Sequence, residues 1–181
     1  DEAGIDRPVV SQPLYNVLNR MIEVEHLPAC AHFGLGVFPY SPLARGVLTG
    51  KYLPGQEPPP DTRAGRKDVE LMRREWRPES LEVVQRLREY AEGRGMTVAQ
   101  FALDWLLSNA LVTAVLAGPR TLDQWTGYLG ALEHGFDADD AALVDRLIPP
   151  GHASAYGYTD PVYPVTGRVH RDLHPDGRPT G

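Results

Sequence analysis

The chain has 181 residues, 42% of them hydrophobic and 23% charged, which is typical of a globular protein with one sizeable core. Its formal net charge of −6 argues against a general nucleic-acid-binding protein, because such proteins are usually basic. A single cysteine, Cys30, excludes an internal disulfide framework, and no apolar run approaches the ~20 residues that span a bilayer.

The N-terminal part of the chain predicts two strands separated by a helix. Residues 7–12 have the pattern of a short buried strand that ends in polar side chains, and residues 35–38 form a second apolar run. Between them, residues 19–32 carry apolar side chains at helical spacing. Pro28 interrupts this pattern, so we expect a break or a new first turn there, and Gly34 predicts the helix end.

The middle of the chain is rich in proline and then in charge. Residues 53–66 form a proline-rich loop that is too long for an ordinary connection, and loops of this length are usually functional or disordered. The charged stretch 67–77 follows it. Its arginines, Arg73, Arg74 and Arg77, are expected on a solvated helix face rather than in a nucleic-acid-binding patch.

The C-terminal half alternates helices with one further strand. A helix is predicted over residues 78–93, and Thr97 begins the next one with a capping box. Residues 112–117 are an unbroken run of small apolar side chains, which is typical of a strand buried on both faces of a parallel sheet. Thr121 predicts a second capping box, and Asp137 begins a last helix.

This order of elements predicts an α/β fold with about three parallel strands and helical crossovers. A closed eight-stranded barrel typically takes about 250 residues, so the chain is too short for a whole barrel, and we expect it to be the C-terminal half of one. We expect the partial barrel to cover residues 1–150 and residues 151–181 to form an irregular tail. The chain begins with Asp1 rather than Met, so we expect a fragment or a processed product, located in the cytoplasm because no signal peptide pattern is present.

The carboxyl ends of parallel strands meet at one face, where α/β proteins bind ligands. The turn at Gly118 and Arg120 leads into the helix capped by Thr121, and a helix N-terminus beside an arginine suits an anion. Lys51 and Arg63 could add positive charge to the same ligand. The alternatives are that the cap satisfies its own donors and that each basic residue is a solvated surface charge.

Several motifs together resemble the aldo-keto reductase family over roughly residues 8–150. They are Ser11-Gln12-x-x-Tyr15-Asn16, Tyr40-Ser41-Pro42-Leu43-Ala44-x-Gly46-x-Leu48-Thr49-Gly50-Lys51-Tyr52, Thr62-Arg63-Ala64, Gln100-x-Ala102-Leu103-x-Trp105-Leu106 and Gly118-Pro119-Arg120-x-x-x-Gln124. The resemblance implies a TIM barrel that reduces aldehydes and ketones with NADP(H), without a flavin or a metal.

The resemblance also implies roles at the nicotinamide and pyrophosphate. Gln12 matches the residue that hydrogen-bonds the nicotinamide carboxamide, and Tyr40 matches the aromatic residue that stacks on the nicotinamide ring. Stacking and an amide contact would fix one face of the ring for hydride transfer. The loop that follows matches the segment along the pyrophosphate, with Ser41, Pro42, Leu43 and Arg45 as its expected contacts.

Further matches lie at the adenosine end of the cofactor. Lys51 and Arg63 match basic residues that clasp this end in some branches of the family. Gly118, Arg120 and Gln124 match the segment around the 2′-phosphate and the adenine ribose. Arginine and lysine suit a phosphate chemically, because their cationic donors form strong hydrogen bonds with it.

The chain departs from the family pattern in two ways. A Glu-Asn pair that usually faces the adenine is replaced by Gly127 and Tyr128. The family's proton-donating Tyr, with its Lys, Asp and His, lies on the first half of the barrel, so the sequence predicts no catalytic residue within this chain. We expect a small carbonyl substrate, and an N-terminal half-barrel supplied in cis or in trans, with neither nucleic acid nor membrane as a partner.

Two other interpretations stay open. The chain could be a non-catalytic truncated remnant, or a nucleotide-binding or interaction module that keeps part of the cofactor loop. It could also be a generic phosphate-binding βα protein, in which case the match of residues 40–52 to the cofactor loop of the family would be a coincidence.

Overall fold

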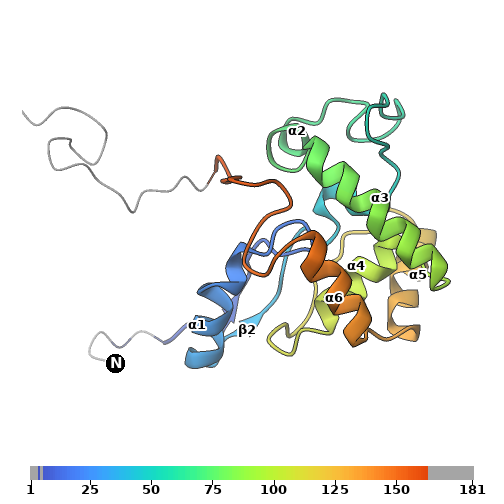
Figure 1. Ribbon diagram of the computed structural model, residues 1–181. Helices are drawn as coiled ribbons and strands as arrows, with labels where there is room; N and C mark the ends of the chain where they lie inside the picture. Colours follow the sequence, from blue (N-terminus) through green and yellow to red (C-terminus); the bar gives the residue numbers. More distant parts are fainter. Residues whose placement is uncertain (1–3, 5, 163–181) are drawn as a thin grey trace, which may run out of the picture.

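The computed structural model describes Gly4 and residues 6–162, and it confirms an α/β chain with a short parallel sheet toward one side of the folded part (Figure 1). Strand β1 (Val10–Ser11) pairs in parallel with β2 (Gly36–Val37), with Val10 opposite Gly36. The helical elements in chain order are the 3₁₀ turn η1 (Met21–Glu23), α1 (His26–Phe33), the 3₁₀ segment η2 (Ala44–Thr49), α2 (Val69–Arg74), α3 (Pro78–Gly93), α4 (Val98–Leu107), α5 (Leu122–Leu129), the 3₁₀ turn η3 (Gly130–Glu133) and α6 (Ala138–Leu147).

The pairing of the two strands continues beyond their regular part. Hydrogen bonds run from Phe38 N to Ser11 O at 2.9 Å and from Tyr40 N to Pro13 O at 3.0 Å. Their even spacing at every second residue is that of a parallel ladder. The ends of both strands therefore lie side by side.

The third strand, predicted over residues 112–117, is not a regular strand. The segment runs beside β2, with Thr113 N donating to Val37 O at 2.9 Å. However, Val37 N donates to the side-chain Oγ1 of Thr113 at 3.1 Å, so the main-chain ladder is interrupted. The predicted burial on both faces is also wrong, since Leu116 is 43% exposed. An apolar run is buried on both faces only where neighbours cover both, and β2 is the one described strand beside it.

The helix predicted over residues 19–32 is divided into η1 and α1. Pro28 lies in the first turn of α1, where its missing N–H would have no partner in the helix. Gly34 ends α1 with a φ of 69°, the left-handed conformation that glycine adopts without steric cost. Both local predictions, a new first turn at Pro28 and an end at Gly34, are confirmed.

Helix caps follow the sequence closely, with one exception. Thr97 and Asp137 begin α4 and α6 with complete capping boxes. At α5 only half of the predicted box forms, because Thr121 Oγ1 accepts from Gln124 N at 3.2 Å. The Gln124 side chain instead accepts from Arg120 N at 2.8 Å, which closes the turn before the helix.

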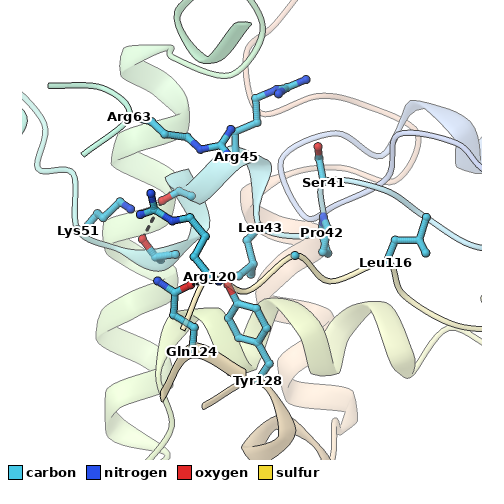
Figure 2. A pocket seen from close by; sticks show the side chains of 13 residues that line it. Ser41, Pro42, Leu43, Arg45, Lys51, Arg63, Leu116, Arg120, Gln124 and Tyr128 are labelled. Atoms are coloured by element: carbon cyan, nitrogen blue, oxygen red, sulfur yellow. Dashed lines mark hydrogen bonds between the residues drawn. The ribbon is translucent and has the colours of Figure 1, made fainter. Parts of the chain in front are cut away.

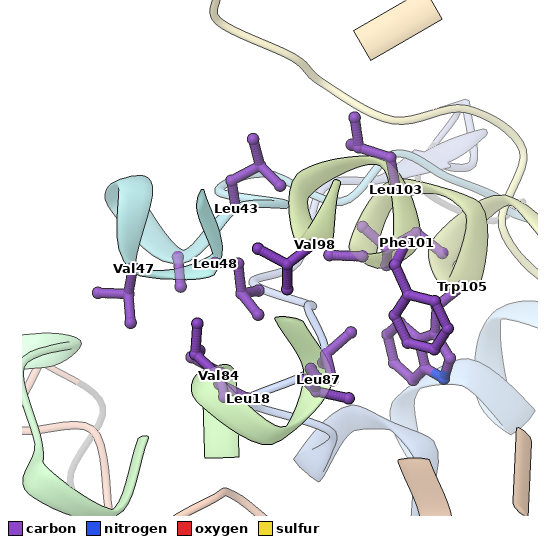
Figure 3. Close-up of a cluster of buried hydrophobic side chains, with 14 of the residues drawn as sticks. Leu18, Leu43, Val47, Leu48, Val84, Leu87, Val98, Phe101, Leu103 and Trp105 are labelled. Atoms are coloured by element: carbon purple, nitrogen blue, oxygen red, sulfur yellow. The ribbon is translucent and has the colours of Figure 1, made fainter. Parts of the chain in front are cut away.

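The core lies between α3, α4 and the loop after β2 (Figure 3). The predicted apolar face of α3 is buried, and Val84 and Leu87 are fully enclosed. They meet Phe101 of α4 and Leu48 of η2 in one continuous cluster, together with Leu18. The loop that carries the expected cofactor contacts is therefore held in place by its own apolar side chains, which are buried in this core cluster.

The described part of the predicted tail, residues 151–162, contains no helix and lies against the rest of the chain. Arg20 N donates to His152 O at 2.9 Å, and Ser154 N donates to Leu18 O at 2.9 Å. Residues 163–181 lie outside the described residues. Within the described part of the chain, no helix is long and apolar enough to cross a membrane.

Replacing Leu87 by alanine should lower the free energy of unfolding by about 2–5 kcal/mol, because the fully buried side chain would leave a cavity. The matched control is Leu122→Ala, since that leucine is 76% exposed and its loss should change stability by less than about 0.5 kcal/mol. Denaturant unfolding followed by circular dichroism measures both. Equal losses for the two variants would contradict the placement of the core.

Candidate functional site

Nine of the residues that the sequence predicts as ligand contacts line one pocket of about 290 Å³ (Figure 2). They are Ser41, Pro42, Leu43, Arg45, Lys51, Arg63, Gly118, Arg120 and Gln124. The other two, Gln12 and Tyr40, line a second pocket of about 360 Å³. Because Tyr40 and Ser41 are consecutive, the two pockets border the same point of the chain. Contact of these eleven residues with a cofactor stays a prediction.

The loop after β2 has an unusual backbone. Ser41, Ala44 and Arg45 have φ values of 53°, 46° and 53°, a region that non-glycine residues rarely adopt. Such strain persists only where the surroundings enforce it, and it is concentrated at binding sites. One restraint is Asn16, which is buried and donates from Nδ2 to Ser41 O at 3.0 Å. The loop is thus held in a compact shape before any ligand binds.

Gly46 completes this loop and determines where Lys51 can lie. Its φ is 99°, which favours glycine, and a Cβ at this position would come within 3.3 Å of Lys51 Nζ. The ammonium of Lys51 also lies 5.1 Å from the centre of the Tyr52 ring. The lysine therefore extends across the glycine toward the pocket.

Positive charge converges on this pocket from three separate segments. Lys51 comes from the end of the loop after β2, Arg63 from the proline-rich loop and Arg120 from the turn before α5 (Figure 2). The described residues that line the pocket include no acidic side chain. Arg45 also lines it, but its guanidinium extends away from Lys51 and Arg120 in Figure 2.

The turn before α5 uses two of its backbone donors internally. Arg120 N and Gln124 N donate to the side chains of Gln124 and Thr121, respectively. This partly supports the alternative that the cap satisfies its own donors. The Arg120 side chain is exposed, so an anion here would be bound mainly by the guanidinium. Tyr128, which replaces a residue of the usual family pair, lines the pocket as well.

The prediction that Arg74 and Arg77 lie on a solvated face is wrong. Arg74 is 7% exposed, and its Nη2 donates to Asp160 Oδ2 at 2.6 Å and to the Tyr40 hydroxyl at 3.4 Å. The guanidinium of Arg77 lies 3.9 Å from the centre of the Tyr158 ring. The described tail residues cover this side of α2, and nothing in the local sequence of 67–77 signals that cover. Arg73 is exposed, as predicted.

Glu75 is a buried acid that the sequence did not single out. It is 2% exposed, and burial raises its pKa from an ordinary 4.5 to about 7. The positive charges of Arg77, Arg45 and Arg74 oppose this rise in the pKa.

Residues 1–149 match a family model described as the aldo/keto reductase family. The chain belongs to this family. Its members are oxidoreductases of the (β/α)8 barrel fold that generally use NAD(P)H, which agrees with the α/β architecture found here.

Individual relatives match most of this chain. L-glyceraldehyde 3-phosphate reductase of Escherichia coli O157:H7 is 35% identical over 153 residues, which cover 82% of this chain and 44% of the relative. Aflatoxin B1 aldehyde reductase member 2 of Homo sapiens is 33% identical over 163 residues, covering 82% and 45%. A probable voltage-gated potassium channel subunit beta of Oryza sativa subsp. japonica is 37% identical over 127 residues, covering 70% and 39%. The chain thus spans less than half the length of these relatives.

The raised pKa of Glu75 makes the stability of this chain depend on pH. The folded state holds the proton more tightly than the unfolded state, so the resulting stabilisation is complete below pH 4.5 and is lost as the pH rises to about 7. Glu75→Gln stays neutral and escapes this loss. Its stability relative to the wild type should therefore increase by on the order of 2 kcal/mol between pH 5 and pH 8.

Denaturant unfolding at the two pH values measures this change, with Glu89→Gln as the control because Glu89 is exposed on α3. A difference between wild type and Glu75→Gln that is the same at both pH values would contradict the assignment.

Proposed function

We propose that this chain holds NADP(H) in an aldo/keto reductase that transfers hydride between the cofactor and an aldehyde or ketone. The observation that carries the proposal is a pocket whose described lining residues include Arg45, Lys51, Arg63 and Arg120 and no acidic residue, in a chain whose net charge is −6. Such a local excess of positive charge favours a ligand with several phosphate groups.

The two pockets suit the two ends of a dinucleotide. The pyrophosphate and the 2′-phosphate would lie in the basic pocket, with Arg120 and Lys51 as partners of the 2′-phosphate. The nicotinamide would lie in the pocket of Gln12 and Tyr40, which offers one amide and one aromatic ring. The turn at Tyr40–Ser41 joins the pockets, so a single extended ligand can reach both.

The roles of this chain in the reaction are binding and orientation. NADPH supplies the hydride when it is bound. Stacking on Tyr40 and a hydrogen bond from Gln12 to the carboxamide would hold one face of the nicotinamide toward the substrate. Fixing this orientation in advance lowers the entropic cost of reaching the transition state for hydride transfer. The strained loop around Ser41 is fixed in advance by Asn16, so little ordering would remain to be done on binding.

The proton for the carbonyl oxygen is assigned to a partner half-barrel, in cis or in trans, which carries the Tyr, Lys, Asp and His of the family. Tyr15 does not fit this role, because it is buried and its hydroxyl donates to Glu23 at 2.6 Å. Burial and the contact with Glu23 raise its pKa far above neutrality.

A second candidate is a non-catalytic nucleotide-binding or interaction module. It is favoured by Gly127, which offers the adenine no side chain where the family usually has one, and by the exposed apolar residues Val9 and Leu116. Consumption of NADPH with a simple aldehyde, after the chain is combined with the first half-barrel of a relative, separates the two candidates. Turnover supports the enzyme, and tight binding without turnover supports the module.

Calorimetric titration of the purified chain with NADPH, and with NADH for comparison, tests the cofactor assignment directly. Arg120→Ala and Lys51→Ala should each weaken NADPH binding by about 10-fold or more, because each removes a charge-assisted contact of about 1.5–3 kcal/mol. The affinity for NADH should change much less, since it lacks the 2′-phosphate.

The control for these variants is Arg146→Ala, at an exposed arginine in the last turn of α6 that lines neither pocket. The same loss of NADPH affinity in the control, or no binding by the wild type, would overturn the assignment.

A further inference from the structure

One residue in the wall of the pocket that contains Gln12 and Tyr40 belongs to a buried ion pair. Asp160 lines this pocket together with Thr159. Its Oδ2 accepts from Arg74 Nη2 at 2.6 Å and from Arg74 Nε at 3.0 Å. Arg74 and Asp160 are each 7% exposed, so the pair is largely removed from solvent and from screening by salt.

This pair joins three segments that are distant in sequence. Arg74 ends α2, Asp160 belongs to the described end of the tail, and Tyr40 follows β2. The Tyr40 hydroxyl accepts from Arg74 Nη2 at 3.4 Å, on the same nitrogen that binds Asp160. One guanidinium therefore contacts both the tail and the hydroxyl group of Tyr40.

Further hydrogen bonds fix the tail at this point. The Tyr158 hydroxyl donates to Arg74 O at 3.0 Å, and Val162 N donates to Asp160 Oδ1 at 2.9 Å. Both carboxylate oxygens of Asp160 are therefore occupied, one by Arg74 and one by the tail backbone. Together these hydrogen bonds fix the position of the tail residues that line the pocket, because each bond restrains a different atom.

We propose that Arg74 and Asp160 are positioning residues that fix the Tyr40 ring and the tail wall for the nicotinamide end of the cofactor. This inference rests on the proposed function, since Tyr40 matters only if it stacks on the ligand. Replacing Asp160 removes the carboxylate that accepts from Nε and Nη2 of Arg74 inside a largely buried contact, which displaces the tail or draws water into the pocket. The basic pocket does not include either residue, so phosphate binding there should be unaffected.

The test compares two probes that differ in reach. NADPH extends into both pockets, whereas adenosine 2′,5′-bisphosphate carries the adenosine and its phosphates but no nicotinamide. In Asp160→Asn the affinity for NADPH should fall by about 10-fold, and that for the bisphosphate should stay within about twofold. Asp160→Glu retains the carboxylate and should recover most of the loss.

The control is Asp145→Asn. Asp145 also makes a long-range pair, with Arg20 Nη1 at 2.7 Å, but it lines neither of the two pockets. The Asp145→Asn substitution should therefore change neither the affinity for NADPH nor that for the bisphosphate. If Asp160→Asn leaves both affinities unchanged, or weakens both probes equally, the positioning role is overturned while the cofactor assignment stands.

Failure of the wild type to bind either probe would overturn the proposed function instead. Hydrogen exchange of the unliganded chain then still tests the positioning of the loop. Asp160→Asn should speed exchange both in residues 153–162 and in residues 40–46, because Arg74 links them. Faster exchange in the tail alone would show that the pair anchors the tail without acting on Tyr40.

Discussion

The parallel pairing of β1 with β2 is the constraint on which the candidate site depends. The hydrogen bond from Tyr40 N to Pro13 O places the end of one strand beside the end of the other, so that Gln12 and Tyr40 line one pocket. A shift of one residue in this register would turn every side chain to the opposite face of the sheet. The regular strands have two residues each, so the register is secured largely by what packs on the loop after β2.

The core provides that support. Leu48 of η2 is enclosed with Leu87 of α3 and Phe101 of α4, which fixes the base of the loop. Above this base, Ser41 and Arg45 are held at positive φ. The free energy released by burying these apolar side chains offsets the cost of the strained conformation. The shape of the binding loop is therefore a consequence of core packing and not a property of the loop sequence alone.

The features that the sequence predicted correctly are those encoded locally. The helix end at Gly34 and the caps at Thr97 and Asp137 depend on neighbouring residues, and all three are found. The strand expected over residues 112–117 was wrong, because burial on both faces depends on what lies beside the segment and not on its composition. The Thr113 side chain that takes the place of a main-chain partner is likewise invisible to hydrophobic patterning.

The same distinction holds for the site. Strand ends and family motifs identified the residues of the basic pocket, because each lies in a short segment with its own signal. The pair of Arg74 and Asp160 could not be found this way, since 86 residues separate its members and neither stands in a recognised motif. The pair becomes evident only in the structure, where the tail crosses α2. The prediction that Arg74 is solvated was wrong because the tail covers it.

The basic residues around the two pockets divide into two groups with different surroundings. Arg74 is paired with Asp160, so its charge is largely compensated within the protein, and the guanidinium of Arg45 extends away from Lys51 and Arg120 (Figure 2). Among the ion pairs of the described residues, none involves Lys51, Arg63 or Arg120. Compensated cations give a site its shape, whereas uncompensated ones on loops supply attraction for an anion. The charge available to a phosphate ligand is therefore concentrated on Lys51, Arg63 and Arg120.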